Sequence, residues 1–103
     1  MAFVAQDLLP PVKQWLRIVT DALDDELLQT IQSCEIDLIN GGVAKVDSSD
    51  AVVQQAVKLY CKAMFGYDSD SEKFSAAYEH LKAALALSGI YNKEADDGQG
   101  GGN

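Results

Sequence analysis

The one histidine is the first place to look for acid–base catalysis. His80 is the single histidine among 103 residues. A general base needs a partner group and a pocket, and the sequence places no serine or cysteine nucleophile convincingly near it. His80 falls on the polar side of an expected helix, so we interpret it as a surface residue.

Two acidic clusters raise the question of a metal site. Asp24, Asp25 and Glu26 are adjacent, but adjacent helical residues point in different directions, and acids are favoured near the positive end of a helix. The run from Asp68 to Glu72 faintly resembles the opening of a calcium loop, yet it lacks the spaced glycine and the closing glutamate. Helix starts explain both clusters, and no metal site is predicted.

The two cysteines, Cys34 and Cys61, fall on or beside apolar helical faces. No CxxC pair or His/Cys cluster surrounds them, so they are predicted to be buried free thiols. The glycines sit at a helix stop and in the last residues of the chain, not in a phosphate-binding loop. The sequence therefore predicts no enzyme activity and no cofactor.

Composition narrows the class of protein. Apolar residues make up 48% of the chain, which excludes global disorder, and the length suits one domain. Sixteen acids against eight scattered bases give a formal charge of −8, which argues against a surface that grips nucleic acid. The acid excess indicates a solvated surface or a basic protein partner. No signal peptide or membrane-length apolar run appears, so we expect a protein that is intracellular or is built inside a cell.

The stretch from Ala51 to Tyr91 predicts an antiparallel helical hairpin that forms the core of the fold. Each arm repeats apolar residues at helical spacing, and the two arms are joined by the polar turn 66–70. The wide apolar arc of the first arm predicts a central helix covered on several sides. Ser69 and Glu72 have capping-box spacing at the start of the second arm. The repeating residues are Val53, Val57, Tyr60 and Met64 in the first arm, and Phe74, Tyr78, Leu81 and Leu85 in the second.

Two shorter helices are predicted before this hairpin. Residues 1–9 show no clear period and are expected to form an irregular arm, after which Pro10 and Pro11 open the first helix. The second helix starts near the acids at 24–26, with Thr20 or Asp21 as its cap, and ends at Gly41. The loop 41–49 follows and offers its last three residues as caps for the central helix; these are Asp47, Ser48 and Ser49.

The predicted architecture is therefore all-α, a small bundle of about four helices. One helical domain covers residues 1–91. Residues 92–103 have no large apolar side chain and are rich in glycine, so this segment is expected to be a flexible, disordered tail in isolation.

This pattern resembles the phage head–tail connector family, the adaptor or head-completion proteins of long-tailed bacteriophages. The resemblance covers roughly Leu8 to Asn92 and is most specific in the third helix and the turn after it, which resemble those of phages of Gram-positive hosts. The segments that carry it are VKQWLRI at 12–18, DDELL at 24–28, GGV at 41–43, AVKLYCKAMFGYD at 56–68, Phe74, Tyr78, Leu81-Lys82, and LALSGIY at 85–91.

The resemblance implies a structural virion protein at the head–tail interface, assembled in the host cytoplasm. Such a subunit docks as a ring of about twelvefold order on the portal protein after DNA packaging. The ring extends the DNA channel, lets DNA pass without sequence-specific binding, and seats a stopper or tail-completion protein. In the family, contacts commonly come from the chain ends and the inter-helix loop, which here are residues 1–9, 41–49 and 87 onward.

Helical phase adds contact candidates of its own. Ile36 lies about 180° from Leu27 on the second helix, and Leu87 falls outside the apolar stripe of the last helix. Ile90 and Tyr91 follow the helix stop at Gly89. Together with Leu87 they form a compact apolar group at the end of the last helix that the bundle does not obviously bury. The predicted partner-interface residues are Ile36, Val43, Val46, Leu87, Ile90 and Tyr91.

Two other classes of protein compete with this reading. A small acidic inhibitor or DNA mimic that binds a basic enzyme would gather its acids on one face, whereas here they are spread over caps, turns and tail. A helix-turn-helix DNA binder would need a basic recognition helix, and the bases of the last helix are balanced by Glu72 and Glu79. We therefore predict a non-enzymatic virion connector that is monomeric or weakly associated until it meets the portal.

Overall fold

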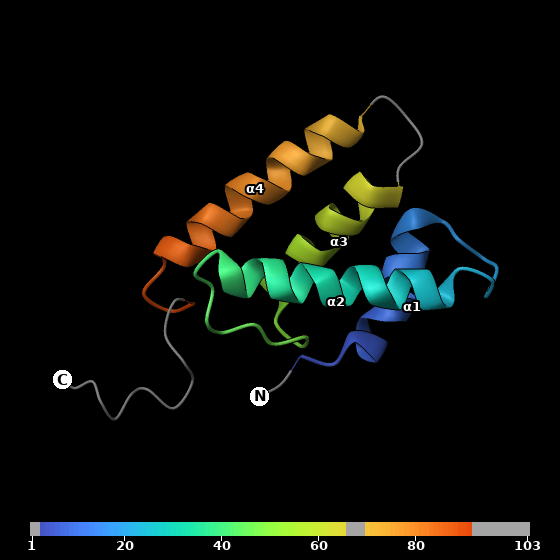
Figure 1. The fold of residues 1–103 in the computed structure, drawn as a ribbon, viewed down its shortest axis with the longest axis horizontal. Coiled ribbons are helices and arrows are strands. Elements are labelled where there is room, and N and C mark those ends of the chain that lie inside the picture. Colours follow the sequence, from blue (N-terminus) through green and yellow to red (C-terminus); the bar gives the residue numbers. More distant parts are fainter. Residues whose placement is uncertain (1–2, 66–69, 92–103) are drawn as a thin grey trace.

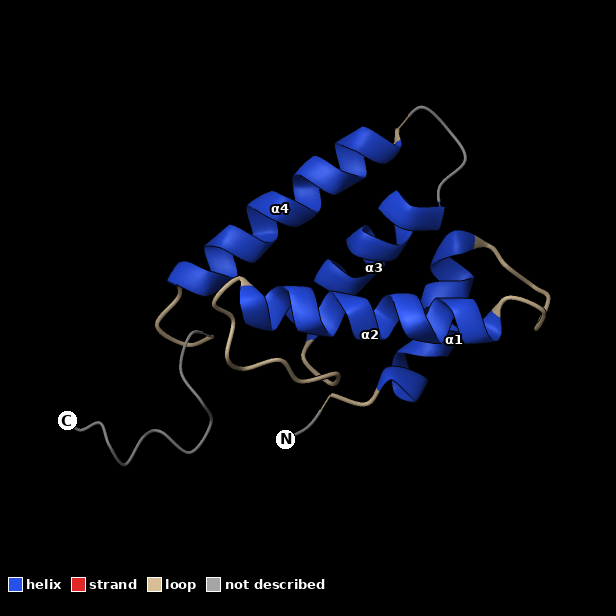
Figure 2. Cartoon of the chain, viewed as in Figure 1, coloured by secondary structure: helices blue, strands red, loops and turns tan. Residues whose placement is uncertain are grey.

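The computed structural model describes residues 3–65 and 70–91, and these residues form four α-helices joined by loops (Figure 1). No strand occurs within these two ranges (Figure 2), so the all-α prediction is confirmed. The predicted Ser69–Glu72 capping box depends on Ser69, which lies outside the described residues, as does the predicted tail at 92–103. The helices are α1 (Ala5–Leu16), α2 (Asp24–Asn40), α3 (Ala51–Phe65) and α4 (Ser71–Leu87).

Helix α3 is the centre of the bundle, as predicted. It packs against α1, α2 and α4, and four of its side chains are completely buried: Val53, Ala56, Val57 and Cys61. Helix α4 runs back beside α3 as the second arm of the hairpin, while α2 crosses in front of α3 in Figure 1. A helix covered on three sides needs the broad apolar arc that this sequence carries.

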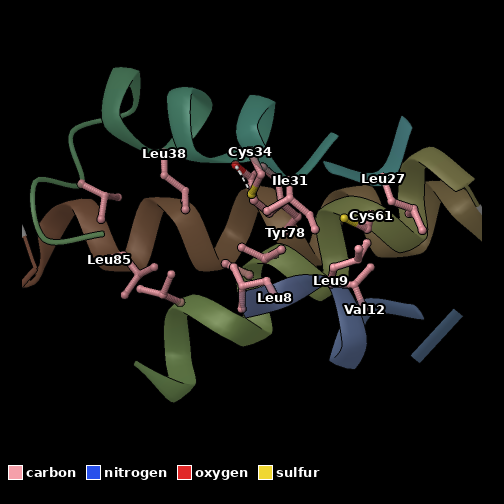
Figure 3. Packing of buried hydrophobic residues seen from close by; sticks show 14 residues of the cluster. Leu8, Leu9, Val12, Leu27, Ile31, Cys34, Leu38, Cys61, Tyr78 and Leu85 are labelled. Atoms are coloured by element: carbon pink, nitrogen blue, oxygen red, sulfur yellow. Dashed lines mark hydrogen bonds between the residues drawn. The ribbon is translucent and has the colours of Figure 1, made fainter. Parts of the chain in front are cut away.

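The core draws side chains from every helix. Figure 3 shows leucines of α1 and α2 converging on the cysteines and on Tyr78. Helix α4 is the outermost contributor, because only Tyr78 and Leu85 among its residues are buried. The ring of Tyr78 packs edge-on against Tyr60, with ring centroids 5.1 Å apart.

Helix α1 begins earlier than the sequence suggested. The predicted irregular arm 1–9 is wrong beyond residue 4, because α1 starts at Ala5 and carries Pro10 and Pro11 inside it. A proline inside a helix removes a hydrogen bond and costs about 3 kcal/mol. Burial of Leu8 and Leu9, which are 1% and 7% exposed, offsets this cost at about 1.5–3 kcal/mol for each side chain.

The caps also differ from those predicted. The cap of α3 is Asp50, whose Oδ1 accepts hydrogen bonds from the amides of Val52 at 2.8 Å and Val53 at 3.2 Å. Asp47 instead accepts from the amide and hydroxyl of Ser49 within the loop, both at 2.9 Å. One carboxylate nearer the helix reaches two of its free N–H groups, which is the geometry an N-cap requires.

At the start of α2 the residue in the cap position is Leu23, and it makes no side-chain cap. The predicted caps are therefore wrong here too. Thr20 accepts from the amide of Ala22, and Asp21 binds the ammonium of Lys13 at 2.8 Å. The three acids predicted to favour the helix start do occupy its first turn.

Candidate contact surface at one end of the bundle

The structure divides the six predicted interface residues into three groups. Ile36, Leu87 and Ile90 are exposed, with 58%, 84% and 65% of their surface accessible. Val46 and Tyr91 are half-buried against the core. Val43 is fully buried, so its side chain is a core residue and not an accessible contact.

Val43 is buried because of the way α2 ends. Gly42 adopts a left-handed φ of 100°. The amide of Val43 donates to the carbonyl of Leu38, and the amide of Gly42 donates to that of Ile39, both at 3.0 Å. This pair of bonds is the Schellman motif, in which the residue after the glycine packs against the helix three residues before its cap. Leu38 and Val43, both 0% exposed, are that apolar pair.

Ile39 is an exposed apolar residue that the sequence analysis did not select. It is 51% exposed and lies three residues after Ile36, so the two side chains are neighbours on one helix face. Ile39 also lines an open hollow of about 280 Å³ together with Gly42, Val43 and Ala44. The end of α2 therefore presents a small apolar surface.

A polar bridge between α2 and α4 fixes the direction in which Ile36 and Ile39 point. The hydroxyl of Tyr78 donates to Asp37 Oδ2 at 2.6 Å, and Lys82 Nζ donates to the same oxygen at 2.9 Å. Asp37 and Leu38 thus face α4 and the core, and the pair Ile36 and Ile39 centres about 180° away from them.

Leu87 points away from the bundle by the same reasoning. It lies nine residues after Tyr78, which is about 180° around α4, and Tyr78 faces α2 and α3. The exposed apolar side chains of α2 and of the α4 exit therefore lie on different outer faces of the molecule.

Electrostatics keep the bridge charged. The hydrogen bond from Tyr78, with that from Lys82, holds the pKa of Asp37 below its ordinary value. Burial alone would lower the pKa of Lys82, but hydrogen bonds to Asp37 and Glu79 outweigh it and raise that pKa. Burial and the bond to Asp37 raise the pKa of Tyr78, which stays a protonated donor. The bridge is an ion pair with a phenol attached, suited to holding helices together.

Three segments expected to make contacts are tied together at this end. The amide of Val4 donates to Ser48 Oγ at 3.1 Å, which joins the N-terminal segment to the loop 41–49. The amides of Ala44 and Lys45 donate to the carbonyl of Tyr91 at 2.8 and 2.9 Å, which joins the loop to the exit of α4. The Tyr91 hydroxyl, in turn, donates to the Asp50 carboxylate at 2.9 Å.

The described residues offer little for covalent or metal chemistry. Cys34 and Cys61 are free and buried, as predicted, and burial raises the pKa of each thiol to about 12, far from the thiolate that reacts. His80 is exposed. Residues 3–65 and 70–91 contain no group of three potential metal ligands. None of the helices in these ranges combines the length and apolar character that crossing a bilayer requires.

Comparison with known proteins identifies a family. The sequence model of a family described as "Phage connector protein" matches residues 8–92, which is the extent of the resemblance found in the sequence. No curated protein and no solved structure matches the chain.

Proposed function

The chain belongs to the phage connector protein family, and on that premise we propose that it is a subunit of the head–tail connector. In this proposal the protein docks as a ring on the portal vertex after DNA packaging. The ring extends the DNA channel and seats the stopper or tail-completion protein. Membership of a connector family supports a structural role in the virion and not an enzymatic one.

The observation that carries the proposal is the pair of separate apolar surfaces. Ile36 and Ile39 face outward from α2, and Leu87 and Ile90 are exposed where α4 ends. A ring of identical subunits needs two different surfaces on each copy, one for each neighbour, because its contacts are head-to-tail. Exposed apolar side chains on two outer faces fit that need, whereas a two-fold dimer would use one self-complementary face.

The clustering of three contact segments supports docking on the portal through one end of the bundle. The loop 41–49 is hydrogen-bonded to the N-terminal segment on one side and to the exit of α4 on the other. A platform joined in this way presents several short elements at once, and simultaneous weak contacts on a preformed portal add up to strong binding. The formal charge of −8 suits a channel through which DNA passes without adhering.

Co-sedimentation with portal-bearing, DNA-filled capsids tests this function. We expect the wild-type protein to sediment with these capsids and not with capsids that lack the portal. Ile36→Glu and Leu87→Glu should each reduce the bound protein by about tenfold, because they place a charge in an apolar contact. The matched control is Val19→Glu, at a residue that is 97% exposed outside the helices, and it should bind normally. Absence of wild-type binding would contradict the function.

A further inference from the structure

A second hollow, of about 470 Å³, lies between α1 and α3, away from the apolar surfaces. Its lining is Pro11, Gln14, Trp15, Arg17, Lys58 and Lys62. Three of these six side chains are cations, in a chain whose formal charge is −8. We refer to it below as the basic hollow.

Within residues 3–65 and 70–91, the three cations of the basic hollow form no ion pair with an acidic side chain. Every ion pair among the described residues involves Lys13 or Lys82. Lys58 and Lys62 instead hold their ammonium groups over the Trp15 ring, 5.3 and 5.9 Å from its centroid. Cation–π contacts of this kind position a cation but leave its charge uncancelled.

Arg17 occupies its place at some conformational cost. It is the one non-glycine residue with positive φ in the described ranges, at 60°. Its amide bonds to the carbonyl of Gln14 and the amide of Ile18 to that of Lys13, so α1 ends in a Schellman motif with arginine where glycine is favoured. An unfavourable backbone position held by a charged side chain at a hollow points to a use for that charge.

The hollow calls for a ligand that accepts hydrogen bonds and carries negative charge. Arg17, Lys58 and Lys62 only donate. The indole Nε1–H of Trp15, another residue of the lining, is buried without an acceptor among the described residues. Carboxylates suit such a set better than the DNA backbone does, because the net charge of the whole molecule repels a polyanion.

This chain carries a matching acidic segment. Glu94, Asp96 and Asp97 give three carboxylates within four residues. We propose that the basic hollow binds the acidic segment 94–97 of a neighbouring copy, an inference that rests on the proposed ring. Each copy would then offer one hollow and one acidic segment, which is again a head-to-tail contact.

The reach of the acidic segment can be compared with the distance to the hollow in the same copy. Tyr91 is bonded to Asp50 at the start of α3, whereas Lys58 and Lys62 lie eight and twelve residues further along, about 12–18 Å along the axis. Residues 94–97 lie three to six residues beyond Tyr91, so their span is at most about 10–21 Å. The far end of this segment can therefore span the distance within one copy, and the choice of a neighbour follows from the head-to-tail contacts of the proposed ring.

Charge exchange in full-length protein tests the proposal. One variant, Arg17→Glu with Lys58→Glu, makes the hollow acidic, and a second, Glu94→Lys with Asp96→Lys and Asp97→Lys, makes the segment basic. Each alone should associate on the portal about tenfold more weakly than wild type. A mixture of the two should recover wild-type occupancy, since each hollow again meets an opposite charge. Lys73→Glu, an exposed lysine of α4, is the matched control and should behave as wild type.

The outcomes separate the possible occupants. Recovery only when both sets of changes are in one chain would show docking within a copy and overturn the proposal. Unchanged ring occupancy in both variants would overturn it and leave the connector function standing. If the hollow variant lost DNA binding at low salt but still associated on the portal like wild type, the hollow would be a nucleic-acid site. That result would also overturn the proposal. Failure of wild-type protein to bind capsids, by contrast, would count against the function itself.

Two further measurements do not depend on capsids. Trp15 is the only tryptophan, so its emission should change as concentrated full-length protein is diluted. This change should vanish in the variant with Glu94→Gln, Asp96→Asn and Asp97→Asn.

Arg17→Gly relieves the strained backbone at the end of α1, so it should keep or raise the unfolding temperature while weakening association between copies. If Arg17→Gly lowered the unfolding temperature, or left association between copies unchanged, a binding role for Arg17 would be contradicted.

Discussion

Tyr78 of α4 and Asp37 of α2 are joined by a 2.6 Å hydrogen bond in which the phenol donates to the carboxylate. This bond crosses between helices that share few other contacts. Lys82 and the Sγ of Cys34, whose thiol lies 3.8 Å from the Tyr78 hydroxyl (Figure 3), complete the group. The bridge orients α2 so that Ile36 and Ile39 face outward, and it therefore connects the core to the proposed contact surface.

Replacement of Tyr78 by phenylalanine tests that bridge. The ring and its packing stay, but Asp37 loses its shortest partner, so we expect about 1–2 kcal/mol less stability, given that Asp37 is partly exposed. Urea unfolding followed by circular dichroism measures the change. Tyr60→Phe, in the ring packed against Tyr78, is the control and should cost much less; equal costs would assign the effect to packing.

Acid should weaken the same bridge. The hydrogen bonds from Tyr78 and Lys82 hold the pKa of Asp37 in the folded protein below its ordinary value of 3.8. A depressed carboxyl pKa contributes stability that is full above the unfolded value and is lost as pH falls through the folded value. The stability difference between wild type and Asp37→Asn should therefore shrink between about pH 5 and pH 2. A difference that stays constant over this interval would refute the charged bridge.

Asp50 serves two elements, because it caps α3 and accepts the hydrogen bond of Tyr91. Asp50→Ala should lower the free energy of unfolding by about 1–2 kcal/mol for the cap alone, with more for the lost Tyr91 tie. Asp47→Ala, three residues earlier, removes bonds to Ser49 only and serves as the control. A double-mutant cycle with Tyr91→Phe should show a coupling energy above about 0.5 kcal/mol; simple additivity would contradict the shared role.

The early start of α1 makes its own prediction. Leu8→Ala removes a side chain that is 1% exposed and should cost about 2–5 kcal/mol. Val4→Ala, at a residue that is 43% exposed just before the helix, should cost well under half of that. Thermal unfolding of the two variants decides the matter, and equal small effects would restore the irregular arm.

The sequence predicted the hairpin and most of the phase of its helices, because each depends on local spacing; Met64, expected on the apolar stripe of the first arm, is 60% exposed. Ile36 and Leu87 came out exposed for this reason. The first half of helix α1 was not predicted, although Ala5, Leu8, Leu9 and Val12 have helical spacing, because Pro10 and Pro11 were taken to mark its first turn. Their cost is offset only by tertiary burial, which local spacing does not report.

Val43 and the basic hollow show two different limits of predicting a site from the sequence. A signal for Val43 was present, because a glycine at a helix end followed by an apolar residue is the Schellman pattern. The hollow gave no such signal: Arg17 and Lys58 are 41 residues apart in the sequence, and only the packing of α1 on α3 brings them to one cavity.

Electron microscopy of the portal vertex tests the central claim most directly. DNA-filled capsids are imaged with and without the purified protein, and the portal vertex is averaged. We expect a ring of added density directly under the portal, with a symmetry matching that of the portal and a channel open along its axis. A vertex identical in the two samples, or protein bound elsewhere on the capsid, would contradict the connector assignment proposed here.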